Sequence, residues 1–291
     1  MNRLEGRVIV VTGAASGIGR SLALAFGRAG CRVVVADIEQ EALDESRREL
    51  ATLGCECLAV VTDVADAQSV KALAARAIEH FGRVHVLCNS AGVSARRAIT
   101  DMALDDWRWV IGVDLWGVIH GIHAFLPVLL DQDEAHVVNV SSMAGLLPFV
   151  LGAPYNAAKA GVVAISETLY QEMELLGANV GVSVVCPGGV RTRFLDSERN
   201  RPEALQPTAR SQLAPSVAFD EINAGARQLI ESEGMDPNDV ADLVVEAVRS
   251  RTFYVLSHRD EYRRAIEERT QDILLGRPPS PVVVEKPGSP T

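Results

Sequence analysis

Two kinds of hydrophobic pattern alternate along most of this chain. Short apolar runs rich in β-branched residues lie at residues 7–11, 32–36, 58–61, 84–88, 137–140 and 180–185. Such near-continuous apolar runs are typical of strands that are buried on both faces. Between them, apolar residues recur every three or four positions, and three of these stretches end at Gly30, Gly54 and Gly82, as helices with C-terminal caps do. The alternation predicts an α/β fold: a doubly wound, Rossmann-type parallel sheet with helices on both faces.

The domain organisation follows from where this pattern continues and where it breaks. It runs without a linker to about Leu275, which predicts a single domain over residues 1–275. Residues 191–235 are polar and irregular, with Pro202, Pro207 and Pro215, and predict a substrate-binding loop or lid. The Pro-rich tail, residues 276–291, is expected to be extended or disordered.

Charge and cysteine content exclude several classes of function. The net charge of −10 opposes binding to nucleic acid or to anionic lipid, so neither is expected as a partner. The five cysteines are scattered and lack His partners at ligand spacing, which indicates reduced thiols in a cytoplasmic protein and no metal site. No apolar run approaches the roughly 20 residues of a membrane helix, and the first apolar run leads into a Gly-rich turn rather than a cleavage site.

A Gly-rich turn, TGAASGIG, occupies residues 12–19 between the first strand and the first helix. Glycines there allow close approach of the backbone to a pyrophosphate, and the N-terminus of the next helix attracts its charge. The plain alternative is a tight strand-to-helix turn without a ligand. The candidate cofactor residues in it are Gly13, Ser16, Gly17, Ile18 and Gly19.

Asp37 ends the second predicted strand, eighteen residues after Gly19. A carboxylate at this place accepts hydrogen bonds from an adenosine ribose and repels a 2′-phosphate. Ile38 follows it, and neither Arg nor Lys is placed nearby in sequence, so the pattern predicts NAD rather than NADP. The alternative role for Asp37 is an N-cap of the next helix.

Tyr155 and Lys159 are four residues apart in YNAAK, and therefore share one face of a predicted helix. A nearby cation favours a phenolate, so Lys159 is expected to lower the pKa of Tyr155 and suit it to proton transfer. Without further context, such a pair is most often an ordinary surface feature.

Several motifs in order supply that context. They are TGAASGIG, Asp37, Asp63-Val64, the NSAG of residues 89–92, Ser142, YNAAK and the PGGVRT of residues 187–192. With them the chain resembles the short-chain dehydrogenase/reductase family over nearly all of residues 5–257. The resemblance implies hydride transfer between a carbinol carbon and the nicotinamide, with Tyr155 exchanging the proton, Lys159 assisting it and holding the ribose, and Ser142 orienting the substrate oxygen. Ser141 is the competing candidate for that last role.

The resemblance also assigns the remaining cofactor contacts. Asp63 and Val64 would meet the adenine, and Val190 and Thr192 would hold the carboxamide. The remaining implied cofactor residues are Asn89, Ala91, Gly92, Pro187 and Gly188.

One position departs from the family pattern. The segment VDLWG has Asp114 where the family usually has an Asn that links the lysine through water to solvent. An Asp has nearly the same shape but can carry charge and has no amide donor. An ionised Asp114 would stabilise the lysine ammonium and oppose the phenolate, whereas the alternative is a carboxylate that only caps a local kink.

The expected activity is NAD(H)-dependent interconversion of a secondary alcohol and a ketone. The apolar residues 146–151 would line the pocket and favour a bulky hydrophobic substrate. An oxoacyl or sugar ketone reductase and a non-catalytic NAD-binding regulatory protein are the alternatives. Arg96 and Arg97 could meet an acidic substrate, but a solvated loop is the preferred interpretation. The long helices expected over residues 105–130 and 155–176, together with the resemblance, predict a homo-oligomer, a tetramer.

Overall fold

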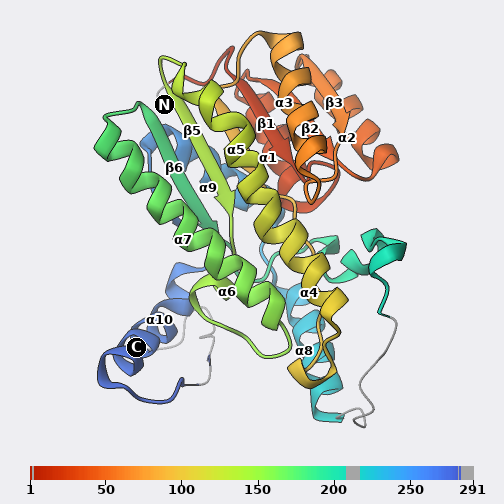
Figure 1. Cartoon of the computed structure of the whole chain (residues 1–291), viewed down its shortest axis with the longest axis vertical. Helices are drawn as coiled ribbons and strands as arrows, with labels where there is room; N and C mark the ends of the chain where they lie inside the picture. Colours follow the sequence, from red (N-terminus) through yellow and green to blue (C-terminus); the bar gives the residue numbers. More distant parts are fainter. Residues whose placement is uncertain (2, 208–216, 281, 283–291) are drawn as a thin grey trace.

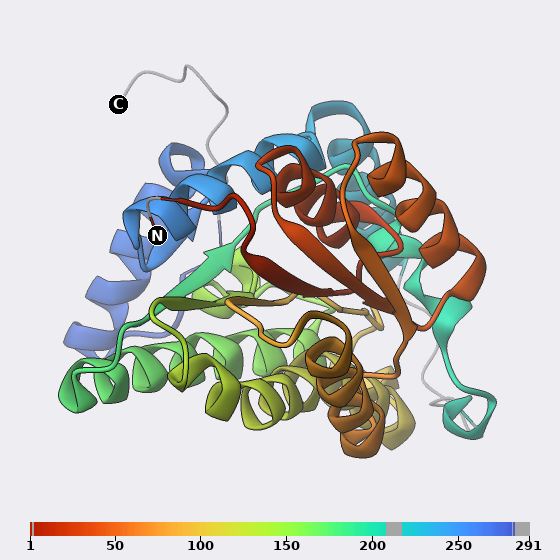
Figure 2. The same cartoon turned by 90° about the horizontal axis from the view of Figure 1, so that it is seen from above.

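The computed structural model describes residues 1, 3–207, 217–280 and 282, which form one sheet covered by helices on both faces (Figures 1 and 2). The strands are β1 (Val8–Thr12), β2 (Arg32–Asp37), β3 (Cys57–Val61), β4 (Val86–Asn89), β5 (Ala135–Val140), β6 (Val180–Cys186) and β7 (Tyr254–Leu256). All pair in parallel, in the order β3-β2-β1-β4-β5-β6-β7. The six sequence-predicted strands and the Rossmann-type fold are confirmed, and β7 was missed.

The two faces of the sheet carry separate hydrophobic cores (Figure 2). One face packs against α1 (Gly17–Arg28), α2 (Gln40–Thr52) and α9 (Pro237–Ser250), and the other against α3 (Ala67–Phe81), α5 (Gly117–Leu130) and α7 (Ala153–Leu176). Residues such as Val33 and Val34 alternate between these cores, because successive side chains of a strand point to opposite faces. The predicted helix ends Gly30, Gly54 and Gly82 all have positive φ, 81°, 71° and 74°, as C-terminal caps require.

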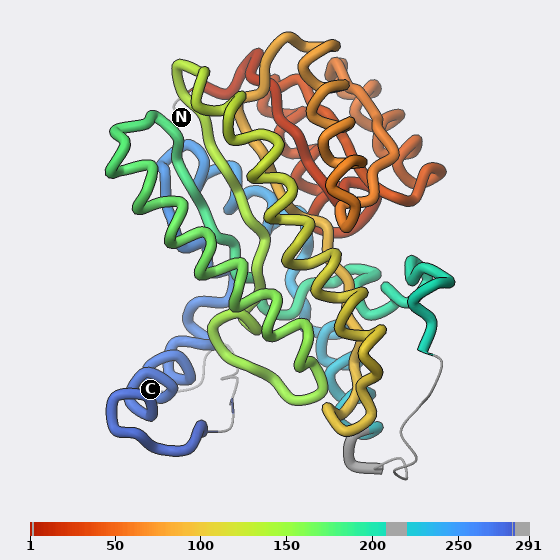
Figure 3. Tube along the Cα trace, in the orientation of Figure 1, coloured from red at the N-terminus to blue at the C-terminus, as the bar shows by residue number. Residues whose placement is uncertain are grey.

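The remaining helices lie at the carboxyl end of the sheet, in the lower part of Figures 1 and 3. They are α4 (Leu104–Ile111), α6 (Met143–Leu146), α8 (Val217–Glu233) and α10 (Arg259–Leu275), with short 3-10 turns η1 (Ile99–Asp101), η3 (Arg193–Asn200) and η4 (Glu203–Leu205). These helices and turns build the wall of a cleft at the end of the sheet where parallel sheets bind ligands.

The expected long helix over residues 105–130 is present, but a π-helical turn, η2 (Gly112–Trp116), interrupts it. The continuous helical segment Leu104–Leu130 is long and apolar enough to cross a membrane by length and composition. This differs from the expectation drawn from uninterrupted apolar runs. Its packing against α3, α7 and β4 identifies it as a packing helix of the fold.

The expectation that residues 191–235 form an irregular loop is wrong in its second half. Residues 191–207, here called the strap, contain only η3 and η4, but residues 217–233 form α8. Ile222, Ala226 and Leu229 recur at helical spacing in α8, a pattern that the three prolines obscured in the sequence. Residues 208–216 lie outside the described residues.

The start of the Pro-rich tail is attached to the domain. The Ser280 backbone N–H donates to Asp272 of α10 at 2.9 Å, and Val282 packs against the cluster that contains Leu147 and Tyr262. Residues 281 and 283–291 lie outside the described residues, so the expectation for most of the tail stays a prediction.

Candidate active site

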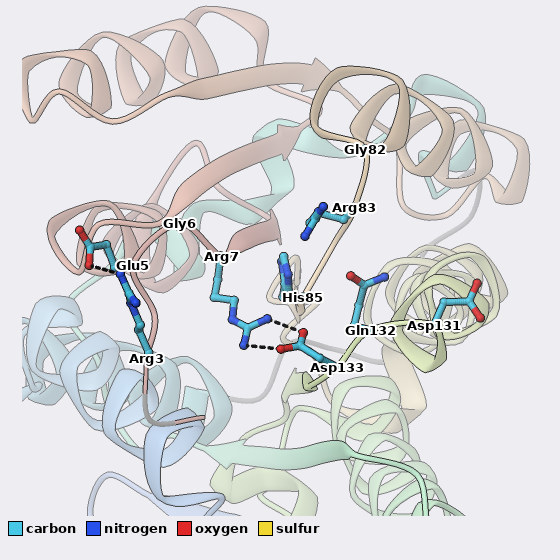
Figure 4. A pocket seen from close by; sticks show the side chains of 10 residues that line it. All are labelled: Arg3, Glu5, Gly6, Arg7, Gly82, Arg83, His85, Asp131, Gln132 and Asp133. Atoms are coloured by element: carbon cyan, nitrogen blue, oxygen red, sulfur yellow. Dashed lines mark hydrogen bonds and ion pairs between the residues drawn. The ribbon is translucent and has the colours of Figure 1, made fainter.

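Two hollows mark opposite ends of the sheet. One, of about 650 Å³, lies at the amino ends of the strands (Figure 4). Arg7 forms a two-pronged ion pair with Asp133 there, and the Val8 N–H donates to Nδ1 of buried His85. These contacts join segments of the fold and engage the Arg7, Asp133 and His85 side chains with one another or with the backbone. The other, of about 780 Å³, is lined by residues that directly follow the carboxyl ends of six strands: Gly13, Ile38, Thr62, Ser90, Ser141 and Pro187.

The Gly-rich turn forms the floor of this cavity beside the N-terminus of α1. A Cβ on Gly13 would stand 2.7 Å from the Ala91 backbone, and a Cβ on Gly19 would stand 2.1 Å from the Gly13 carbonyl oxygen. Only glycine fits at these two positions. Gly17 has φ +53°, and the Ser16 side chain makes no capping hydrogen bond, which leaves the first N–H groups of α1 facing the cavity. The turn therefore has the shape and the donors that a pyrophosphate needs.

Asp37 lies at the edge of the same floor. Its carboxylate accepts hydrogen bonds from the Ala15 N–H at 2.9 Å and the Glu39 N–H at 3.1 Å, and it provides no cap to α2. Burial raises the pKa of Asp37, while these N–H donors oppose that rise. The carboxylate is thus fixed where a ribose diol can donate to it, and the alternative role as an N-cap is excluded.

A cation lies close to Asp37, although the neighbouring sequence predicted none. Arg199 of the strap donates to Glu39 at 2.6 Å, and Asn200 donates to the same oxygen at 2.8 Å. The sequence could not show this contact because Arg199 and Glu39 are 160 residues apart. The guanidinium is thus paired with Glu39, and Arg193 places a second positive charge near that carboxylate.

The remaining predicted cofactor residues line the cavity, with one exception. The residues that do so are Asp63, Val64, Ala91, Gly92, Pro187, Gly188, Val190 and Thr192. Asn89 does not, and its predicted place on the cofactor floor is wrong. Its side chain donates to Asn139 at 2.8 Å inside the core, where it also faces Gly121 of α5. Ser90 lines the cavity instead, and its buried hydroxyl has no hydrogen-bond partner among the described residues.

Tyr155, Lys159 and Ser142 converge at the centre of the cavity. Tyr155 and Lys159 lie one turn apart on α7, with the lysine Nζ 5.6 Å from the centre of the phenol ring. Ser142 caps α6 after β5, and its hydroxyl forms a hydrogen bond that favours the Tyr155 phenolate. The Ser141 hydroxyl instead donates to the Lys159 carbonyl at 2.8 Å and is buried. This arrangement favours Ser142 over Ser141 as the residue that meets a substrate oxygen.

The expected lowering of the Tyr155 pKa is not found. Burial raises the pKa of Tyr155 above its usual value, and the charge of Asp114 raises it further. The Ser142 hydrogen bond and the charge of Arg96 act in the opposite direction. The expectation from Lys159 did not include desolvation, whereas the opposing effect of an ionised Asp114 had been expected.

Asp114 faces Lys159 and not solvent. Its Oδ2 is 3.3 Å from the Lys159 Nζ, its Oδ1 accepts the Val93 N–H at 2.8 Å, and its side chain is fully buried. Lys159 also donates to the Val140 carbonyl at 3.0 Å. Asp114 lies in η2, whose extra residue per turn changes the direction of the side chains that follow. The carboxylate therefore reaches the reaction centre from behind the lysine, and the alternative of a mere kink cap is excluded.

The wall opposite the sheet comes from the strap and α8. Thr192 lies against Gly17, the Phe194 ring lies 5.2 Å from the Tyr155 ring, and Ile222 and Leu229 of α8 face the cavity. Of residues 146–151, only Phe149 and Val150 line the cavity, because Leu147 and Leu151 are buried in the core. The predicted lining from residues 146–151 is thus reduced to these two, and Phe194, Ile222 and Leu229 come from the segment 191–235 that was predicted to bind substrate.

The strap is held by a buried ion pair. Arg201 donates to Asp106 of α4 at 2.7 Å, both side chains are almost fully buried, and the guanidinium stacks 5.0 Å from the Trp109 ring. Arg96 is half-buried and lines the cavity, so its assignment to a solvated loop is wrong. The described residues contain no cluster of His, Cys, Asp or Glu that could hold a metal ion, and His120 instead hydrogen-bonds the Val64 carbonyl.

Comparison with known proteins agrees with this geometry. The family model of short chain dehydrogenases matches residues 7–203. The chain is 31% identical to a C alpha-dehydrogenase of Sphingobium sp., over 94% of this chain and 87% of the relative. It is 34% identical to a 1-deoxy-11-beta-hydroxypentalenate dehydrogenase of Streptomyces exfoliatus, over 96% of this chain and 93% of the relative.

A solved structure extends the comparison to the whole fold. A short chain dehydrogenase/reductase from Burkholderia phymatum, in complex with NAD, superposes with a TM-score of 0.91 and 39% identity, covering 96% of this chain and 98% of the other. The protein is a member of the short-chain dehydrogenase/reductase family, and therefore an oxidoreductase with a Rossmann-type fold.

Proposed function

We propose that the protein is an NAD(H)-dependent dehydrogenase that interconverts a secondary alcohol and a ketone. The observation that carries this proposal is that the dinucleotide turn and the Ser142, Tyr155 and Lys159 side chains line one cavity. A single bound substrate can therefore contact the cofactor and the residues that transfer the proton at the same time.

The preference for NAD is supported by charge. Asp37 is fixed by two backbone N–H groups and can accept from a ribose diol, whereas a 2′-phosphate would meet its carboxylate and that of Glu39. The related structure from Burkholderia phymatum was solved with NAD.

The protein residues have separate roles in the proposed reaction. When bound, the nicotinamide ring accepts or supplies the hydride. Ser142 donates a hydrogen bond to the substrate oxygen, and Tyr155 takes its proton during oxidation and returns it during reduction. Lys159 holds the ribose hydroxyls and favours the phenolate, while Asp114 positions the lysine. Phe194 and the strap exclude water from the phenol.

The substrate is proposed to be bulky and largely apolar. Phe149, Val150, Phe194, Ile222 and Leu229 line the substrate end of the cavity. Two relatives are named as dehydrogenases, the C alpha-dehydrogenase and the 1-deoxy-11-beta-hydroxypentalenate dehydrogenase. An oxoacyl or sugar ketone reductase remains the alternative enzyme. The intact Ser142, Tyr155 and Lys159 set argues against a non-catalytic NAD-binding protein.

We further propose a homotetramer in the cytoplasm. Apolar side chains such as Trp116, Leu130 and Leu175 are exposed on the long helices, where a second copy of the chain could cover them. All five cysteines are free thiols, which fits a reducing compartment.

The test is a panel of bulky secondary alcohols, with NADH formation followed by its absorbance. Tyr155→Phe should lower turnover by about a thousandfold or more, because it removes the proton carrier and keeps the ring. NADH binding, measured by fluorescence titration, should stay within a few-fold. Tyr170→Phe, on the exposed side of the same helix, is the matched control and should keep full turnover. Near-normal turnover in Tyr155→Phe would refute the assigned role, and an inactive wild type across the panel would favour the non-catalytic alternative.

A further inference from the structure

Arg96 is held beside the reaction centre by the segments on either side of it. Its neighbour Ala95 is buried in a small cluster with Val93 and Trp109, against which Tyr155 packs. On the other side, the Arg97 N–H donates to the Leu151 carbonyl at 3.0 Å, which ties the segment to the start of α7. The Arg96 side chain lines the cavity, and its charge acts on the Tyr155 phenol.

The guanidinium of Arg96 has no carboxylate partner among the residues that the structure describes. Its Nε donates to the Asn223 side-chain oxygen of α8 at 2.9 Å, and Asn223 is neutral. The adjacent Arg97 differs, because it pairs with Glu198 at 3.4 Å and with Asp106 at 3.8 Å. Burial lowers the pKa of Arg96, so the site destabilises a cation that nothing in this part of the chain neutralises.

We propose that Arg96 recognises a carboxylate on the substrate, so that the protein acts on hydroxy acids, or the matching oxo acids, with a bulky apolar skeleton. This inference rests on the proposed function. A half-buried guanidinium without a counterion gains most from a ligand carboxylate, and its planar fork can donate two parallel hydrogen bonds to it. The apolar side chains of Phe149, Phe194 and Leu229 surround the space that the skeleton would occupy.

Two simpler roles for Arg96 make different predictions. It could only bridge the β4–α4 segment to α8 through Asn223, or it could only act on the Tyr155 phenol. Either role affects neutral and anionic substrates equally, because neither involves the substrate charge. The proposed role affects the anionic substrate selectively.

The experiment compares two secondary alcohols that share one skeleton. One is a (1-hydroxyethyl)benzoate, whose carboxylate is para or meta to the carbinol group, and the other is its neutral N-methylamide. The wild type should prefer the acid in kcat/KM by about 10- to 100-fold, the range expected for one charge-assisted hydrogen-bond pair. Arg96→Gln should remove this preference, so that kcat/KM falls by about 10- to 100-fold more for the acid than for the amide. Asn223→Asp should also reduce the preference, because it gives Arg96 an internal carboxylate. Arg97→Gln is the matched control and should leave the ratio unchanged.

Calorimetry gives a readout that is independent of turnover. The NAD-loaded wild type should bind the matching keto acid, an acetylbenzoate, and Arg96→Gln should raise the Kd by a similar factor. Turnover of the amide without preference for the acid, or equal losses in Arg96→Gln, would overturn the role of Arg96 and leave the dehydrogenase assignment intact. Absence of carboxylate binding by the wild type would also overturn it. Carboxylate binding that depends on Arg96 but without turnover of either probe would support the anion site and contradict the proposed function.

Discussion

Replacing Asp114 with Asn tests how charge is distributed around Tyr155. The change keeps the shape of the side chain and removes a carboxylate whose pKa is raised by burial, while Lys159 and the Val93 N–H oppose that rise. Asp114 Oδ2 lies 3.3 Å from the Lys159 Nζ, which lies 5.6 Å from the centre of the Tyr155 ring. The carboxylate is therefore within about 9 Å of the ring, and at roughly 8 Å with an effective dielectric constant of about 20 the two charges repel by about 2 kcal/mol.

That repulsion corresponds to about 1.5 pKa units. Because the phenolate is no longer opposed in Asp114→Asn, the pKa of Tyr155 should fall by about 1 to 1.5 units. The rising limb of kcat/KM against pH for alcohol oxidation should move to lower pH by the same amount. The plateau value should change less than about threefold, because the hydride and proton donors are untouched.

A cost in stability should accompany this shift. The carboxylate accepts from the Val93 N–H at 2.8 Å and faces the Lys159 ammonium, but an amide can accept from only one of them and turns a donor toward the other. The free energy of unfolding should fall by about 1 to 3 kcal/mol, which thermal unfolding would measure.

The matched control is Glu172→Gln, which makes the same change of charge at an exposed position on α7. Its pH profile should coincide with that of the wild type. Coincident profiles for Asp114→Asn and the wild type, or a shift to higher pH, would refute the electrostatic reasoning. A shift in the control as large as that in Asp114→Asn would show that net charge, rather than the position of Asp114, controls the profile.

Three further predictions concern the cofactor, the assembly and acid stability. Asp37→Ser should raise the NADP-to-NAD ratio of kcat/KM by about a hundredfold, since about 3 kcal/mol of repulsion and ribose hydrogen bonding is lost. Adding Glu39→Gln should raise this ratio further by releasing Arg199. A wild type that uses NADP as well as NAD would contradict the role of Asp37. Light scattering at micromolar concentration should give about four times the chain mass of 31.2 kDa, and a monomer mass would refute the tetramer. Burial lowers the pKa of His85 to about 4, so the unfolded chain binds a proton more readily than the folded one between pH 6.5 and 4. The contribution of neutral His85 to the free energy of unfolding is fully present above pH 6.5 and is lost as the pH falls to 4. Urea unfolding should show a loss of up to about 3 kcal/mol over this range. His85→Asn should make the free energy of unfolding less dependent on pH there.

The parts of the fold that repeat a local pattern could be predicted from the sequence. Strands buried on both faces are continuous apolar runs. In the helices that end at Gly30, Gly54 and Gly82, apolar residues recur every three or four positions. The strand β7 was missed because three residues carry too little pattern. Helix α8 was missed because the neighbouring prolines dominated the reading of its segment.

The site was predictable where its residues are close in sequence. The spacing of Tyr155 and Lys159 on one helix face is a local property, and so is the Gly-rich turn. The contact of Arg199 with Glu39 depends on how the strap folds back over the sheet, and that of Arg96 with Asn223 depends on where α8 lies. The rise in the Tyr155 pKa depends on desolvation, which no spacing in the sequence encodes. Asn89 was misplaced because a motif does not say whether a side chain faces the cavity or the core.

The path of the strap has a kinetic consequence. Near its start Thr192 lies against Gly17 in the first turn of α1, and at its middle Arg199 and Asn200 bind Glu39 after β2. A dinucleotide that extends from the glycine turn to Asp37 would lie under this span, whereas the space in front of Phe194 is bounded by α8 and not by the Glu39 contacts. We therefore expect a compulsory binding order, with the dinucleotide first to arrive and last to depart. At saturating alcohol, the opening of the Glu39 contacts, rather than proton transfer, should then limit the steady-state rate, and the first turnover after mixing should appear as a burst.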